Sequence, residues 1–141
     1  MTFTAANGVE VVDGSWGTAD ASTSSSAVKI STMAASVTGS LLAGTLQVTQ
    51  DLSVSTGNSV EVANKAVIDS TADLILAGGT LGGTGDIVVL GDFVTSGGSL
   101  SGSGLMTVNG NTQISDTNGT LTVDKTLDLR GASTVAGNNT T

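Results

Sequence analysis

The chain has 141 residues and a formal net charge of −8, and it contains 20 Gly but no Pro, Cys, His or Tyr. This length suits a single domain, and the missing Cys and His exclude zinc sites, disulfides, thiol nucleophiles and imidazole catalysis. Four basic residues cannot neutralise a run of phosphates, so we expect no nucleic-acid partner. No apolar run approaches the roughly 18 residues that cross a bilayer, and no signal-peptide pattern opens the chain, so we expect no membrane insertion.

Residues 1–39 form the least regular part of the sequence. Alternating apolar residues at 9–11 and 28–30 are typical of short strands, whereas the Ala- and Ser-rich stretch 19–36 indicates a loop or a short helix. Trp16 is the one Trp of the chain, and its large amphipathic side chain predicts an anchor in a cap or an interface. We expect this segment to be irregular and to form a cap or the first turns of the repeat that follows.

From residue 40 onward, apolar pairs with one residue between them recur at steps of 19 to 21 residues. Such a period is typical of solenoid proteins, in which a single repeat cannot close a core and neighbouring repeats stack. Stacking places each short strand beside its counterpart in the next turn, about 4.8 Å away, as a parallel ladder. The first members of the clearest series are Leu46, Ala66, Ile87, Met106 and Leu127.

Two further apolar series accompany the first, so each turn holds three short strands. Together they predict an all-β fold, a parallel β-solenoid (β-helix) of about five turns over residues 40–141. An antiparallel β-sandwich shares this composition but gives no reason for a period near twenty residues. The second series is Val60, Leu81, Leu100 and Leu121, and the third is Leu52, Leu74 and Phe93, followed by Ile114 and Val135 after small shifts.

The segments GGTLGGTGDIVVLGDF, GGSLSGSGLMTVNGN and NGTLTVDKTLDLRG resemble the repeats of autotransporter passenger and adhesin β-helices. They are also similar to the shaft repeats of phage tail fibres. The resemblance covers about residues 39–136, and it implies an extracellular, rigid and mostly non-catalytic stalk.

Three carboxylates occupy equivalent places in successive repeats. Asp51, Asp73 and Asp92 each precede the second strand of a turn, and Asn111 falls near the same place. Such a column suits Asp that accepts backbone N–H groups at turns, calcium ligands or the paired carboxylates of a glycosidase. No Lys, Arg or aromatic residue accompanies the column, so we expect no catalytic site. The three Asp residues are therefore predicted to cap turns, and they are also candidate calcium ligands.

Four apolar residues alternate with inward-facing positions and are expected to point outward. Val67 and Val88 form one short stripe, and Ile75 and Val94 form another. Single apolar residues on a surface are normal, but contiguous stripes tend to be covered. The stripes therefore predict lateral contact with another subunit or with the N-terminal segment.

These features favour a non-enzymatic structural protein whose partner is itself. We expect a subunit of an extracellular or cell-surface fibre, adhesin stalk or filament, without a cofactor other than Ca²⁺ at the Asp column. The alternatives are a trimeric phage or virion fibre segment, a cytoplasmic filament of stacked β-helices, and a carbohydrate-active β-helix enzyme.

Overall fold

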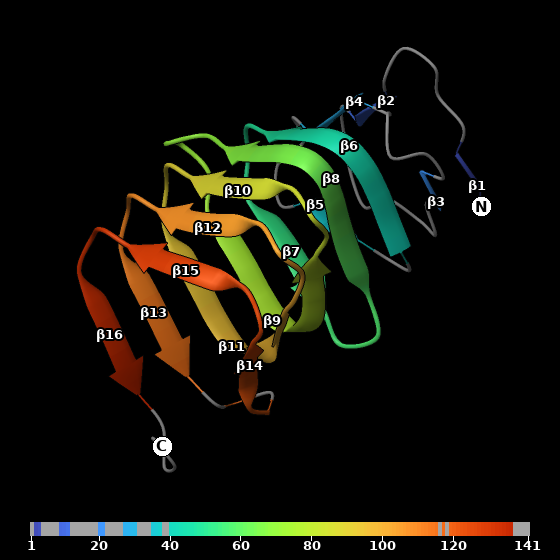
Figure 1. The fold of residues 1–141 in the computed structure, drawn as a ribbon. Helices are drawn as coiled ribbons and strands as arrows, with labels where there is room; N and C mark the ends of the chain where they lie inside the picture. Colours follow the sequence, from blue (N-terminus) through green and yellow to red (C-terminus); the bar gives the residue numbers. More distant parts are fainter. Residues whose placement is uncertain are drawn as a thin grey trace.

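The computed structural model describes residues 2–3, 9–11, 20–21, 27–30, 35–37, 40–115, 117 and 119–136. All regular elements among these residues are β-strands, β1 to β16 in chain order. They form a parallel β-solenoid of about five turns (Figure 1). The predicted solenoid is confirmed, and an antiparallel sandwich is excluded for the described strands because all of their pairings are parallel.

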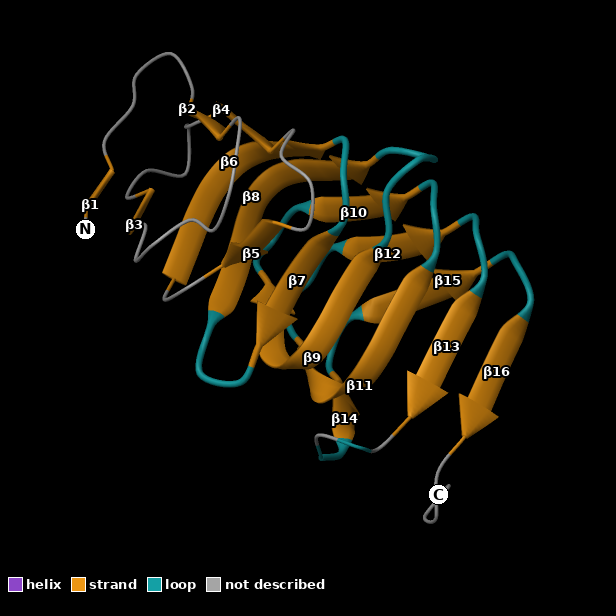
Figure 2. Cartoon of the chain, turned by 180° about the vertical axis from the view of Figure 1, so that it is seen from behind, coloured by secondary structure: helices purple, strands orange, loops and turns teal. Residues whose placement is uncertain are grey.

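Three ladders of strands form the walls of the solenoid, and we call them faces A, B and C. Face A contains β2 (Val9–Val11), β4 (Ala27–Ile30), the second parts of β6 (Ser40–Val48) and β8 (Ser59–Ile68), then β10 (Asp86–Val89), β12 (Leu105–Val108) and β15 (Thr126–Leu129). Face B, turned toward the viewer in Figure 2, contains β5 (Ala35–Val37), β7 (Leu52–Ser55), the first parts of β9 (Leu74–Gly82) and β11 (Phe93–Leu100), then β13 (Thr112–Ser115) and β16 (Ser133–Ala136). Face C contains the remaining parts of β6, β8, β9 and β11, together with β14 (Leu121–Val123).

Strands of the N-terminal segment continue two of these faces. In face A, Val9 pairs with Val28 and Val28 pairs with Leu46, whereas in face B Ala35 pairs with Leu52. β1 (Thr2–Phe3) and β3 (Asp20–Ala21) pair separately. The alternating pair Val28 and Ile30 therefore continues the first series, as its spacing indicated, and the residues of the stretch 19–36 outside β3, β4 and β5 lie outside the described part of the chain.

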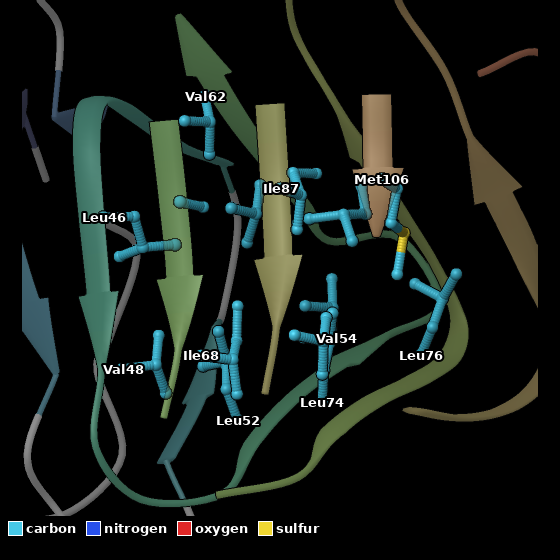
Figure 3. Close-up of a cluster of buried hydrophobic side chains, with 14 of the residues drawn as sticks. Leu46, Val48, Leu52, Val54, Val62, Ile68, Leu74, Leu76, Ile87 and Met106 are labelled. Carbon is cyan, nitrogen blue, oxygen red and sulfur yellow. The ribbon is translucent and has the colours of Figure 1, made fainter. Parts of the chain in front are cut away.

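The interior is a single apolar cluster built from the inward side of all three faces. The first series is confirmed in face A: Leu46, Ala66, Ile87 and Met106 are successive register partners, and each is at most 3% exposed. In Figure 3, Leu46, Ile87 and Met106 lie in the same interior as Leu74 and Leu76 of face B. Strand alternation sends one residue in two to this core, so the outer surfaces are formed by the residues in between.

The second series is wrong in its last member, because Leu100 pairs with Val123 rather than with Leu121. The corner between faces C and A is short in the last turn. There, the two residues Asp124 and Lys125 separate β14 from β15. β14 consequently pairs with β11 in a register that differs from the register of the preceding turns in face C.

The third series is also wrong at its end. Phe93 pairs with Thr112 and Thr112 with Ser133, so no shift toward Ile114 or Val135 occurs. Thr112 fills an inward position and is 1% exposed. No buried side-chain nitrogen or oxygen of the described residues lacks a hydrogen-bond partner, and this is the condition under which a polar side chain can replace an apolar one in a core.

No helix in the described part of the chain has the length and apolar character of a membrane span.

Candidate functional site

The three predicted aspartates lie in one column at the corner between faces A and B. Oδ1 of Asp51 accepts a hydrogen bond from the backbone N–H of Asp73 at 2.9 Å. Oδ1 of Asp73 accepts the N–H of Asp92 at 3.3 Å, and Oδ1 of Asp92 accepts the N–H of Asn111 at 2.8 Å. Each carboxylate therefore caps the backbone of the next turn, and the column connects four successive turns.

The same hydrogen bonds reduce the number of carboxylate oxygens in the column that are left to bind calcium. One oxygen of each carboxylate already serves a backbone N–H group, which is the common role of Asp at turns. Among the residues that the structure describes, no group of three or more His, Cys, Asp or Glu side chains is arranged to hold a metal ion. The geometry of the column is that of backbone capping.

Glycines precede Asp92 and Asn111 and occupy the equivalent position in the following turn, and they allow the turns to stack closely. A Cβ atom added to Gly110 would overlap the backbone of Gly91, and one added to Gly131 would overlap the backbone of Gly110. The corner thus consists of backbone lying on backbone, with the Asp side chains beside it. A side chain at Gly110 would also overlap Oδ1 of Asp92 and so disturb its hydrogen bond to Asn111.

The outer surface of face A carries the first predicted stripe. Val67 and Val88 are register partners, and both are half-buried. The structure adds Leu90 and Leu105, each 38% exposed, to this surface. Leu90 follows Val88 at a spacing of two residues, so the alternation that identified Val88 also identifies Leu90. Leu105 starts the next strand of face A, beside Asp86, in a position that only the register reveals.

The second predicted stripe lies on a different wall. Ile75 and Val94 are register partners on face B and are also half-buried. Their neighbours in the same column are the polar residues Ser53 and Gln113, so this stripe is limited to two residues. Trp16, the remaining interface candidate, lies outside the described residues.

Lys125 is a further notable residue, and the sequence did not single it out. Its Nζ donates a hydrogen bond to the carbonyl oxygen of Gly83 at 3.1 Å, and the residue is only 5% exposed. Burial lowers the pKa of Lys125 below its ordinary value of 10.5, and the nearby negative charge of Asp86 partly offsets this effect. The positive charge is therefore held inside a corner, where it connects turns of the solenoid.

The strand ladders, the capping Asp column and the filled core define this chain as a parallel β-solenoid repeat protein. In comparisons with known proteins, no family model, no curated protein and no solved structure matches the chain.

Proposed function

We propose that this protein is a structural, non-catalytic subunit of an extracellular fibre, adhesin stalk or surface filament. The observation that carries the proposal is the stack of about five turns with a continuous core. Parallel ladders along three walls resist bending, because any bend must stretch backbone hydrogen bonds on one side. The resemblance of the repeats to autotransporter passenger, adhesin and tail-fibre shaft repeats supports the same role.

Two features support assembly through the solenoid end and the outer walls. The edge of the last described turn is formed by β14, β15 and β16, and its Val123 and Val135 are 43% and 57% exposed. Strand edges of this kind favour pairing with further strands, whether of the same chain or of another copy. The apolar stripes on faces A and B offer lateral contacts.

The Asp column supports a non-catalytic role. A glycosidase needs two carboxylates free to act on the substrate, whereas Asp51, Asp73 and Asp92 each hold a backbone N–H group. Their function in this proposal is mechanical, since they connect one turn to the next.

Negative-stain electron microscopy across a concentration series tests the proposal. A structural subunit is expected to give rods that elongate or associate as the concentration rises. Discrete trimers in light scattering would favour a virion fibre segment instead. Polysaccharide cleavage that is lost in Asp73→Asn would overturn the non-catalytic assignment in favour of a carbohydrate-active enzyme.

A further inference from the structure

The last described turn contains β14, β15 and β16, and it pairs with the turn before it along all three faces (Figure 1). We call the contact between these two turns the last boundary. The preceding boundary lies one turn earlier, where β12 pairs with β10 and β13 pairs with β11. Parallel backbone ladders cross both boundaries, but the side chains that reinforce the two contacts differ.

Two carboxylates reinforce the preceding boundary by capping backbone N–H groups. Oδ1 of Asp86 accepts the N–H of Leu105 at 2.9 Å, and Oδ1 of Asp92 accepts the N–H of Asn111 at 2.8 Å. One turn later, Leu105 precedes Met106 as Asp86 precedes Ile87, and an alkyl side chain cannot accept a hydrogen bond. Among the residues that the structure describes, no side chain caps a backbone N–H group across the last boundary.

The inward column of face B is also more polar at the last boundary. Earlier in this column Leu74 pairs with Phe93, and both are at most 1% exposed. Across the last boundary Thr112 pairs with Ser133 instead. Two small polar side chains bury less apolar area than two large apolar ones, and hydrophobic stabilisation scales with that area. Separating the turns is therefore expected to cost less free energy here than at earlier boundaries.

Lys125 supplies a different kind of contact at the last boundary. Its Nζ donates a hydrogen bond to the carbonyl oxygen of Gly83 at 3.1 Å, two turns back. In the described part of the last turn, no other side chain makes a hydrogen bond to an earlier turn. The contact cannot persist when this turn separates from the stack, and a hydrogen bond with a charged donor contributes more than one between neutral groups.

We propose that the last described turn opens and closes as one unit at the last boundary, and that Lys125 locks it in the closed state. Opening removes the register partners of Leu100, Met106 and Thr112, which are at most 1% exposed in the closed state. It also frees the strand edges of β11, β12 and β13 for pairing with other strands. Proteins commonly open in contiguous units of this size. The proposal goes beyond the proposed structural function and does not depend on it.

Hydrogen exchange of individual backbone amides, followed by NMR on the full chain, tests the proposal. The reporters across the last boundary are three amides, one beside each face, which donate as follows: Thr112 to Ala132, Asp124 to Leu100 and Arg130 to Val108. Their counterparts across the preceding boundary are the amides of Phe93, Ser101 and Asn109. We expect the three reporters to share one protection factor, at least about tenfold lower than those of their counterparts.

Three variants identify the lock. Lys125→Met is expected to lower the protection of the three reporters by at least about fivefold and to leave their counterparts unchanged, because only the last boundary loses a hydrogen bond with a charged donor. Lys65→Met changes an exposed lysine and is expected to alter neither set. Asn111→Asp places a carboxylate at the next position of the Asp column, where it can accept the N–H of Ala132, and is expected to raise the protection of the reporters.

Several results would overturn the proposal. Equal protection at the two boundaries in the wild type would mean that the last turn does not open separately. Exchange of Thr112 and Arg130 well before Asp124 would show that single strands fray rather than a whole turn opening. An equal effect of Lys125→Met on both sets of amides would show that Lys125 stabilises the entire fold instead of one boundary. Failure to form rods in electron microscopy would contradict the proposed function alone.

Discussion

Nζ of Lys125 donates a hydrogen bond to the carbonyl oxygen of Gly83, which lies 42 residues earlier and two turns away in the solenoid. Gly104 lies in the intervening turn, and a Cβ atom added there would come within 3.0 Å of Nζ. The missing side chain of Gly104 therefore leaves room for the lysine to cross that turn. Through this contact the last described turn is held to the body of the stack.

Replacing Lys125 with Met tests the contribution of this contact. Lys125→Met keeps the length of the side chain but removes the charged donor, so the free energy of unfolding is expected to fall by about 1 kcal/mol. Lys65→Met changes an exposed lysine and is expected to stay within about 0.5 kcal/mol of the wild type. Urea denaturation of dilute protein measures both. A Lys125→Met variant that is as stable as the wild type would show that the hydrogen bond adds no net stability.

The lowered pKa of Lys125 predicts how the free energy of unfolding changes at alkaline pH. Because its pKa in the folded protein lies below 10.5, the folded state releases this proton before the unfolded chain does as the pH rises. The unfolded state then binds more protons, so the contribution of Lys125 to stability increases with pH up to about 10.5. The chain contains no Tyr, Cys or His, which leaves few other groups that titrate in this range.

Unfolding free energies of the wild type and Lys125→Met, measured from neutral pH to pH 10.5, give the test. The free energy of unfolding of the wild type minus that of Lys125→Met is expected to increase as the pH rises over this interval. Lys65→Met changes an exposed lysine and serves as the control, which should run parallel to the wild type. A flat difference for Lys125→Met would contradict the inferred direction.

The Asp column predicts a graded response to substitution. Asp92→Ala removes the acceptor for the N–H of Asn111 and is expected to lower the free energy of unfolding by about 1 to 2 kcal/mol. Asp92→Asn retains a carbonyl acceptor of similar shape and should lose less. Thermal or denaturant unfolding of the two variants provides the comparison, and equal losses would argue that charge rather than capping matters at this corner.

Calcium dependence separates the capping role of the column from the calcium hypothesis. If the carboxylates act only as backbone caps, the melting temperature should be the same in excess EDTA and in millimolar CaCl₂. Magnesium at the same ionic strength serves as the control for general screening of the acidic chain. A rise in melting temperature that calcium alone produces, and that Asp73→Asn removes, would identify a metal site.

Core packing gives the largest expected effect. Phe93 is 0% exposed in face B, and Phe93→Ala is expected to cost about 3 to 5 kcal/mol, because it removes apolar contacts and leaves a cavity. Gln113 is exposed and is the register partner of Val94, the residue that follows Phe93. Gln113→Ala should therefore change stability by less than about 0.5 kcal/mol. Similar losses for both variants would contradict the assignment of Phe93 to the inward side and Gln113 to the outward side of face B.

Apolar alternation predicted face A well and the ends of the other faces poorly. Leu46, Ala66, Ile87 and Met106 mark their column because apolar side chains fill it in each turn. Thr112 replaces an apolar residue in face B, so the pattern pointed instead to Ile114. A buried hydroxyl group carries no signature in the sequence, since its burial depends on a hydrogen-bond partner supplied by the fold.

The residues of the candidate surfaces were also predicted only in part from the sequence. Alternation was enough to place Val67 and Val88 outward, and their recurrence after 21 residues was enough to align them. Leu105 joins their patch only through the register of β10 with β12. Lys125 was not singled out, because its partner Gly83 lies two turns away.

The sequence pattern by itself determined the class of fold, the period and the inward column of face A, because burial of apolar side chains follows strand alternation and repeats with the turn. Tertiary structure alone decided the register of the last turn, the engagement of the Asp oxygens and the path of Lys125 over Gly104. These depend on corner lengths and on contacts between residues of different turns, which are set when the turns stack and are not encoded in any local segment.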